Sequence, residues 1–435
     1  SVSFFFIFIV LSLDILLLNR LKCKRLDFLN EVNSWGSLLH WQRGCPSESN
    51  SAMNYDDYKS TTRLPMKQSD FSLNRRSFLQ NAAMGAGLTA VSVPSRLLGK
   101  PSPVSSTKVK LGFDNFSIRA LGWKAPRLLE YANEKKVDTI LFSDLDVFES
   151  HDAAYLKEIK QQADKFGIAI HAGTGGICPT SPKFIDKYGS AEDHLKHLLR
   201  VAKTLGSPVA RCYLGSMQDR KGPGGIQKHI ESTIQVCKNV RKHALDAGVK
   251  IAIENHAGDM HSRELADLIE RAGPEYVGAT LDSGNATWTM EDPLDTLENL
   301  APFAVSSGIR DSMIWEIENG ASVQWTAMGE GCVDMKAFAK RWGELCPQVP
   351  IQLEIISGFS KPFPYLETDF WKPYESIRAD GFSRFVALAK EGTPMESFKT
   401  PKGVDRKKAQ QQYQLAELER SIKYSKEALG LGARS

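Results

Sequence analysis

The chain of 435 residues carries 55 Lys and Arg against 51 Asp and Glu, a formal net charge of +4 at pH 7. Because this small excess forms no basic stripe with interleaved aromatic residues, the sequence does not indicate nucleic-acid binding. Only five of the seven cysteines lie beyond residue 107, and their scattered positions without CxxC spacing argue against a disulfide framework or a zinc knuckle.

The first 107 residues have the character of a targeting region. Residues 74–79 read Asn-Arg-Arg-Ser-Phe-Leu and precede a small and apolar run over residues 82–93. This order resembles a twin-arginine export signal, and Met66 stands nine residues before Arg75, where the n-region of such a signal begins. We therefore expect residues 66–107 to be a twin-arginine signal and linker, and the protein to be periplasmic or otherwise exported.

Residues 1–65 are expected to be an upstream segment outside the native fold. An alternative is a signal anchor over residues 3–18, but that apolar run contains Asp14 and is short for a span of about 20 residues. On either interpretation we expect no stable membrane span in the mature protein.

From residue 109 onward, short apolar runs alternate with longer stretches of helical period. In the stretch 226–247, for example, apolar residues recur every three or four positions, which is one face of an α-helix. The runs span residues 109–114, 137–142, 168–173, 208–213, 250–255, 277–282, 302–309 and 350–355. Eight strand–helix units predict an α/β fold, a (β/α)8 TIM barrel. A doubly wound open sheet is the alternative, but no GxGxxG motif follows the first run.

We expect the barrel to occupy residues 108–392 and a C-terminal helical extension to occupy residues 393–435. Within this extension, residues 405–429 are rich in charged and helix-favouring side chains. They predict a helix on the surface of the barrel, and such a helix is a candidate contact in a homo-oligomer.

Three acids interrupt the apolar runs at the ends where a barrel carries its functional groups: Glu254 in IAIEN, Asp282 in ATLDSGN and Glu354 in IQLEI. A buried carboxylate is costly unless it is paired or bound to a cation. Two interpretations follow, a divalent cation held by the three acids together, or separate salt bridges to Arg211, Arg310 or a lysine. The convergence of all three acids favours the cation.

Residues 109 to about 390 also resemble the xylose isomerase-like barrels of the sugar isomerase/epimerase superfamily. The motifs that carry this resemblance are IEN with Glu254, LDxGN with Asp282, the RD turn at Arg310 and Asp311, the Gly-Glu-Gly turn at 329–331, and LE with Glu354.

The resemblance implies a metal-dependent enzyme. Glu254, Asp282 and Glu354 would hold a divalent metal, one of Mn²⁺, Mg²⁺, Co²⁺ or Zn²⁺, and in epimerases the two glutamates also act as acid and base. The physical reason is that a cation stabilises the enediolate left when a proton next to a carbonyl is removed. Two carboxylates on opposite sides of the carbon permit removal on one face and delivery on the other.

The sequence departs from the family at the seventh strand, where the fourth ligand is usually a histidine. Gly308 occupies that position, and no shift of register supplies a histidine because His261 is the last one in the chain. Two alternatives remain open: water, Asp311 or His256 takes the place of this ligand, or the metal is bound weakly or lost.

The expected substrate is a small sugar or sugar derivative. The residues expected to contact it are His171, Arg211, His256, Asn285 and Arg310, and we expect Trp123, Trp288 and Trp315 to lie near the barrel mouth. Isomerisation or epimerisation is the expected reaction. Two alternatives remain open: a lyase that acts on keto-glycosides through the same first step, and a non-catalytic carbohydrate-binding barrel, which the glycine at position 308 would favour.

Overall fold

A computed structural model describes residues 108–374 and 377–434. The predicted signal and upstream segment, residues 1–107, lie outside the described residues. Among the helices of the described part, none combines the length and the apolar character that crossing a membrane requires.

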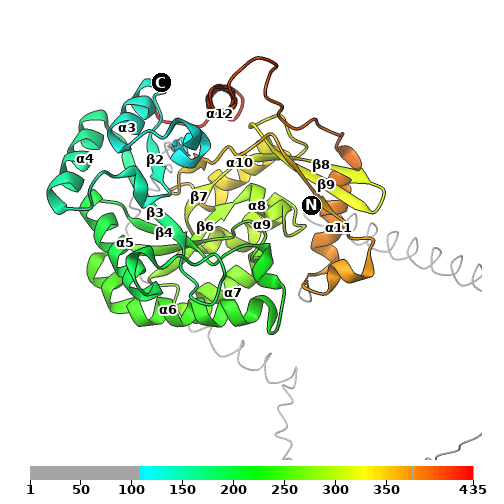
Figure 1. Ribbon diagram of the computed structural model, residues 1–435, viewed down its shortest axis with the longest axis horizontal. Coiled ribbons are helices and arrows are strands. Elements are labelled where there is room, and N and C mark those ends of the chain that lie inside the picture. Colours follow the sequence, from blue (N-terminus) through cyan, green and yellow to red (C-terminus); the bar gives the residue numbers. More distant parts are fainter. Residues whose placement is uncertain (1–107, 375–376, 435) are drawn as a thin grey trace, which may run out of the picture. The chain divides into compact units, whose positions relative to one another are not determined.

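Eight parallel strands form the centre of the fold, in the order β10-β1-β2-β3-β4-β5-β6-β7 (Figure 1). The backbone N–H of Ile309 donates to the carbonyl of Gln352 (2.7 Å), and that of Glu354 donates to the carbonyl of Ile309 (3.0 Å). These bonds join β7 to β10 and close the ring, so the predicted (β/α)8 barrel is confirmed. The barrel strands are β1 (Leu111–Asp114), β2 (Thr139–Phe142), β3 (Ala169–Gly176), β4 (Val209–Tyr213), β5 (Lys250–Glu254), β6 (Val277–Asp282), β7 (Ala304–Gly308) and β10 (Ile351–Leu353).

Each barrel strand begins within one of the eight apolar runs, because a parallel strand covered by helices outside and filled by side chains inside is apolar on both faces. All residues of β2 and β6 are buried. The helices that follow the strands surround the barrel. They are α3 (Ala125–Glu134), α4 (Ala153–Phe166), α5 (Ala191–Leu205), α6 (Gly225–Ala247), α7 (Ser262–Ala272), α8 (Ser283–Thr287), α9 (Pro293–Leu300) and α10 (Met335–Leu345).

Short 3-10 helices occupy several of the connections, and two of them matter for the site. The helix η1 (Asn115–Leu121) follows β1, and η4 (Met217–Arg220) follows β4. The others are η2 (Leu145–Val147), η3 (Asp186–Tyr188), η5 (Ala301–Phe303) and η6 (Thr368–Trp371).

An antiparallel sheet of three strands, in the order β11-β9-β8, was not predicted from the sequence. It consists of β8 (Asp311–Ile317), β9 (Gly320–Thr326) and β11 (Ser360–Phe363). The chain enters this sheet directly after β7 and again after β10, so the sheet arises at the carboxyl end of the barrel. Helix α11 (Ala379–Glu391) packs against β8, and the two share a second hydrophobic core that includes Ile314, Phe363 and Phe385.

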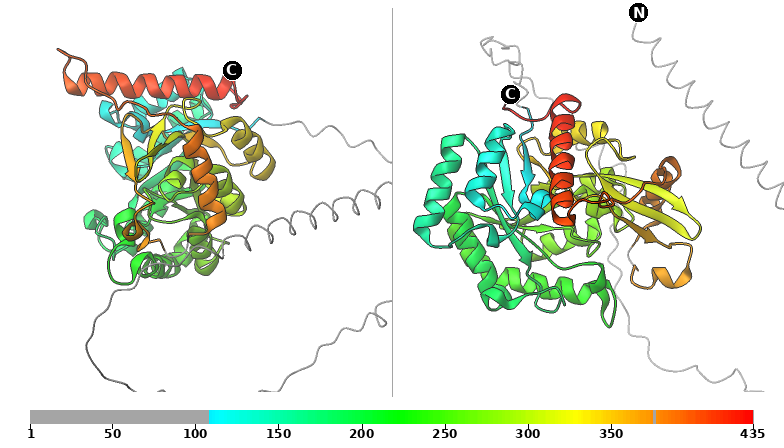
Figure 2. Two further views of the ribbon diagram at one scale, coloured as in Figure 1. Left: turned by 90° about the vertical axis from the view of Figure 1, so that its right-hand side faces the viewer. Right: turned by 45° about the horizontal axis from the view of Figure 1, so that its top comes forward.

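The predicted C-terminal helix is present as α12 (Arg406–Glu427), and it packs against β10 and η1 (Figure 2). Leu418 is fully buried, and the side chain of Gln414 accepts a hydrogen bond from the backbone N–H of Ala120 (2.9 Å). The hydroxyl of Ser421 accepts another from Met328 (3.1 Å). The helix therefore takes the place beside the eighth strand that the last helix of a (β/α)8 barrel occupies.

Candidate active site

Glu254, Asp282 and Glu354 converge at the carboxyl end of the barrel. One side-chain oxygen from each lies within 4.8 Å of the others, and the three side chains are 1%, 0% and 4% exposed. Glu254 ends β5, Asp282 ends β6 and Glu354 follows β10. Two positions before Glu354, the side chain of Gln352 contacts His171 of β3 inside the barrel. Since every second side chain of a strand lies on the same face, Glu354 also points into the barrel.

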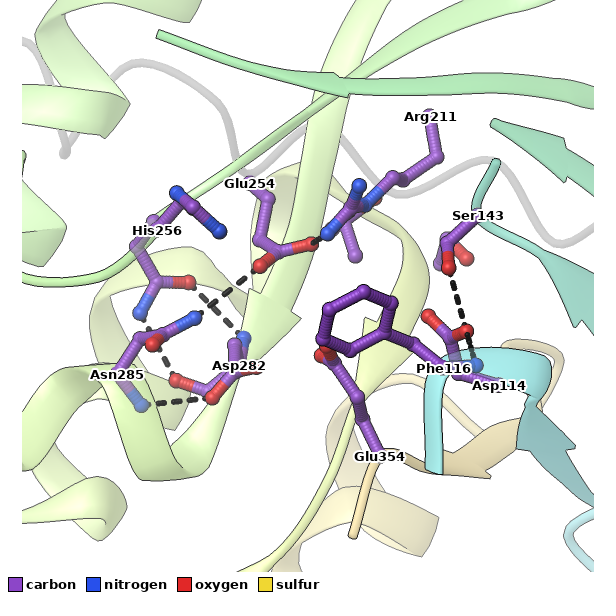
Figure 3. Close-up of polar contacts among 12 residues, drawn as sticks. Asp114, Phe116, Ser143, Arg211, Glu254, His256, Asp282, Asn285 and Glu354 are labelled. Atoms are coloured by element: carbon purple, nitrogen blue, oxygen red, sulfur yellow. Dashed lines mark hydrogen bonds and ion pairs between the residues drawn. The ribbon is translucent and has the colours of Figure 1, made fainter. Parts of the chain in front are cut away.

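Two buried arginines are the counter-ions of these acids. Arg310 donates through Nη2 to Asp282 Oδ2, and through the same nitrogen to Glu354 Oε2 at 2.9 Å. Arg211 donates through Nε to Glu254 Oε2 at 2.6 Å and through Nη1 to the carbonyl of Thr174 at 3.0 Å (Figure 3). The salt bridges that the sequence left open as an alternative are thus present. Two of the predicted substrate contacts, Arg211 and Arg310, lie within the acid cluster.

Two asparagines fix the orientation of the acids. Asn285 donates through Nδ2 to Glu254 Oε1 (3.1 Å), and its backbone N–H donates to Asp282 Oδ1 (2.7 Å) (Figure 3). Asn255 exchanges two bonds with the backbone of Asp282, at 2.8 and 2.9 Å. The glycine of the LDSGN motif has a different role: a side chain at Gly284 would collide with the Arg310 side chain.

A fourth acid, Asp114 at the end of β1, belongs to the same site and was not predicted. It is fully buried, and its Oδ1 accepts from the Ser143 hydroxyl (2.5 Å) and from the backbone N–H of Phe116 (2.7 Å). Its Oδ2 is buried without a hydrogen-bond partner among the described residues. Burial, with Glu354 nearby, raises the pKa of Asp114 to about 7. The signal that could have found it was the one used for the other acids, a carboxylate ending the apolar run VKLGFD.

Burial raises the pKa of each carboxyl in this cluster, and the arginines offset this rise to different extents. The pKa of Glu254 lies well above its usual value because of burial and the neighbouring Glu354 and Asp282, in spite of Arg211. Burial likewise raises the pKa of Asp282 to about 8. For Glu354, the attraction of Arg310 and Arg211 outweighs burial, and its pKa lies below the usual value.

The residues of the cluster fit a divalent cation. Four carboxyls, those of Asp114, Glu254, Asp282 and Glu354, stand against two guanidiniums, so two negative charges are in excess when all are ionised. Carboxylate oxygens are the donors that Mg²⁺ and Mn²⁺ prefer. Arg310 competes for the same oxygens, because its Nη2 already contacts Asp282 and Glu354.

Gly308 lies next to the cluster, as the family resemblance implies. A Cβ at this position would be 2.8 Å from Glu354 Oε2 and 3.0 Å from Asp282 Oδ2. Asp311, one of the candidates for the missing ligand, is committed elsewhere. Its Oδ2 accepts from the backbone N–H groups of Gly329 (3.1 Å) and Gly331 (3.0 Å). The aspartate of the RD motif therefore stabilises the Gly-Glu-Gly turn through its backbone N–H groups.

His256 lies beside Glu254 (Figure 3) and is stacked on Tyr213, with ring centroids 3.7 Å apart. Its Nδ1 is 2.6 Å from the carbonyl of Gly215. Since a carbonyl only accepts, Nδ1 carries the proton, and Nε2 of the neutral ring is an acceptor. Burial, followed by the charge of Arg211, lowers the pKa of His256 to about 4, so the ring is neutral at pH 7.

Residues 118–355 match the family described as "Xylose isomerase-like TIM barrel". The chain belongs to this family.

Among curated proteins, the xylose isomerase-like barrel is similar to the uncharacterized protein YihM of Escherichia coli K12, at 27% identity over 145 residues. These residues are 32% of the chain and 44% of YihM, so the match spans less than half of that relative. Solved structures are more distant. The xylose isomerase domain protein of Planctomyces limnophilus is 18% identical, with a TM-score of 0.44 over 60% of this chain and 92% of that one. D-psicose 3-epimerase with D-tagatose, from Clostridium cellulolyticum H10, is 13% identical, with a TM-score of 0.46 over 72% and 98%.

His171 does not join the site of the xylose isomerase-like barrel. Its Nδ1 contacts Ser306 Oγ (2.9 Å) and Gln352 Nε2 (3.0 Å). Ser306 and Gln352 lie two positions before Gly308 and Glu354 on their strands, so His171 belongs to the layer below the acids, toward the amino-terminal end of the barrel. Burial lowers its pKa to about 4, and a buried, hydrogen-bonded histidine there contributes to the barrel interior.

Of the three tryptophans expected at the mouth, Trp288 lies next to the site. It stacks on Trp325 (centroids 4.2 Å apart), and the guanidinium of Arg310 lies 4.4 Å from the Trp325 ring. Trp123 packs against Tyr131 of α3, and Trp315 is buried within β8. Trp325 was missed because the hairpin that carries it was missed, although Asn319-Gly320 is a hairpin turn signal.

Proposed function

We propose that this xylose isomerase-like barrel is a sugar isomerase or epimerase that transfers a proton at the carbon next to a carbonyl. The observation that supports this most is the placement of Glu254 at the end of β5 and of Glu354 directly after β10, two strands that are separated in the ring by β6 and β7. The two carboxylates therefore reach the cluster from different sides of the barrel, with Asp282 between them.

This arrangement suits removal of a proton on one face of a carbon and delivery on the other. Asn285 and Arg211 hold Glu254 in one orientation, while Arg310 holds Glu354. Orientation matters because proton transfer requires the donor and acceptor atoms within about 3 Å of each other in the reacting complex. The acceptor Nε2 of His256 is placed to receive a hydrogen bond from a substrate hydroxyl beside Glu254.

A divalent cation held by Glu254, Asp282 and Glu354 would stabilise the negative charge of the enediolate. Arg310 contributes in the same direction, since its fixed positive charge lies beside the oxygens of Asp282 and Glu354 in a site where all three side chains are buried.

A lyase on keto-glycosides is a second candidate, and one observation favours it. A cavity of about 1000 Å³ lies along η4 and β11, on the side of the barrel mouth where Trp288 is found. A ligand larger than one sugar unit can be accommodated in a cavity of this size.

The test is solvent exchange. The protein, with Mn²⁺ or Mg²⁺, is incubated in D₂O with free ketoses and, separately, with a 3-keto-glucoside, and the C–H signals next to the carbonyl are followed by proton NMR. Loss of these signals with return of an isomer or epimer supports the proposal, and release of the aglycone identifies the lyase. Sugar binding without exchange in any substrate would leave a carbohydrate-binding barrel.

We also propose that the protein is exported, on the basis of the twin-arginine pattern at Arg75 and Arg76. Replacement of both arginines by lysine should keep the folded protein in the cytoplasm, as cell fractionation would show. Unchanged export of this variant would contradict the proposal.

A further inference from the structure

The cavity of about 1000 Å³ does not include the acid cluster. It is bounded by η4, the start of α6, β11 and residues 369–374. We call it the lysine groove and define it by Met217, Lys221, Lys361, Phe370 and Tyr374. The aromatic and apolar walls of this groove, with a few charged groups, have the composition of a site for a small organic ligand.

The charges of the groove are not balanced within it. Four basic side chains line it, and two of them have acidic partners: Arg220 pairs with Glu264, and Lys372 pairs with Asp369 at 2.8 Å. Lys221 and Lys361 have no carboxylate within salt-bridge distance among residues 108–374 and 377–434. The groove therefore presents two positive charges to whatever occupies it.

A row of aromatic contacts connects the lysine groove with the acid cluster. The Arg310 guanidinium, which bridges Asp282 and Glu354, lies 4.4 Å from the Trp325 ring. Trp325 stacks on Trp288 at 4.2 Å, and Nζ of Lys361 lies 4.8 Å from the Trp288 ring. Each step is shorter than 5 Å, so an unbroken row of side-chain contacts links the wall of the groove to the acids.

We propose that the lysine groove binds an anionic second unit, carrying a carboxylate or a phosphate, of a glycoside whose reacting sugar is held at the acid cluster. This inference rests on the proposed function, because the acid cluster supplies the place of the reacting sugar.

Two properties of the groove support an anion over a neutral sugar. Lys221 and Lys361 repel each other, and an anion between them removes that repulsion while gaining charge-assisted hydrogen bonds. Burial and the nearby Lys221 lower the pKa of Lys361, which is the sign of a cation without a counter-charge.

The test compares charged and neutral disaccharides of the same size. The probes are cellobiose against its C6-carboxylate, and trehalose against trehalose 6-phosphate. Affinity is measured by calorimetry and by tryptophan fluorescence, on the full chain. We expect each anionic probe to bind about ten-fold more tightly than its neutral counterpart, in a salt-sensitive manner. A preference for only one of the two anions identifies the carboxylate or the phosphate as the group bound.

Lys361→Gln and Lys221→Gln should each remove this preference, with little change for the neutral probes. Lys238→Gln is the matched control, since Lys238 is an exposed lysine of α6 outside the groove, and it should keep the preference. Equal affinity for charged and neutral probes, or an equal loss in the Lys238 variant, would overturn the inference.

The outcome is separable from that of the proposed function. If Glu254→Gln keeps the anion preference in binding, the groove is confirmed whatever the fate of catalysis. If free sugars undergo exchange in D₂O but show no anion preference in any probe, the groove fails while the proposed function stands.

Discussion

Replacement of Arg310 by methionine distinguishes neutralisation of the acid cluster by the arginine from neutralisation by a divalent cation. The Arg310 side chain is 1% exposed, and its Nη2 is shared between Asp282 and Glu354. Without it, two buried carboxylates lose their cation. Removal of one partner of a buried ion pair costs about 3–5 kcal/mol, so the free energy of unfolding should fall by that amount in EDTA.

A divalent cation should restore much of this loss. The variant has one fewer positive charge among the acids, and the oxygens that Arg310 occupies become free for coordination, so Mn²⁺ should bind the variant more tightly than the parent protein. A ligand present at 100 times its dissociation constant stabilises the folded state by about 2.7 kcal/mol. The midpoint of urea unfolding should therefore rise steeply with Mn²⁺ in Arg310→Met and only slightly in the parent.

The assay is urea unfolding followed by circular dichroism, in EDTA and across a series of Mn²⁺ concentrations. Arg220→Met is the matched control, because Arg220 is equally buried and paired with Glu264, away from the acid cluster. It should be destabilised without rescue by metal. An absence of metal rescue in Arg310→Met would refute the cation site, and equal rescue in both variants would show that the metal acts elsewhere.

Three further predictions follow from the geometry. Gly308→His should tighten Mn²⁺ binding about ten-fold in calorimetry, because it adds an imidazole ligand beside the acids. The backbone of β7 is extended, and the atoms nearest to the new side chain are the carboxylate ends of Glu354 and Asp282, which can shift. An unchanged affinity would contradict this prediction. Because the folded-state pKa of His171 is about 4, protonation favours the unfolded chain, and about 3 kcal/mol of stability present above pH 6.5 should be lost as the pH falls to 4. His171→Gln should flatten this pH dependence of urea unfolding, and an unaltered slope would refute the assignment. Truncation after Gly403 should abolish soluble expression, because it removes the eighth barrel helix; an unchanged melting temperature would identify that helix as dispensable.

The barrel and its acids could be predicted because both leave one-dimensional signals. A parallel strand is a continuous apolar run, and an acid inside such a run stands out, as Glu254 and Glu354 do. The pairing of Arg310 with both Asp282 and Glu354 is a matter of which side chains meet in three dimensions. The sequence could only name the arginines as alternatives to a metal, and the structure shows them occupying the same oxygens.

Other features were missed for identifiable reasons. Helix α12 buries polar side chains such as Gln414 and Ser421, so its sequence is typical of a solvated helix although it completes the barrel. The hairpin of β8 and β9 follows directly after the RD turn, and its Asn319-Gly320 signal was not used. His171 was expected at the site because it ends an apolar run, but β3 continues for five residues beyond it.

The most direct measurement is the rate of deuterium exchange next to the sugar carbonyl in Glu254→Gln and Glu354→Gln, in D₂O with saturating metal. Each variant should fold and should lose about 10²–10⁴-fold in rate, the usual contribution of general acid–base catalysis. Glu291→Gln is the control, because Glu291 is an equally buried glutamate that accepts from the backbone of Ser262 (2.9 Å) outside the cluster, and it should exchange at the parent rate. A near-normal rate in either Glu254→Gln or Glu354→Gln would show that the acid cluster is structural and that proton transfer occurs elsewhere.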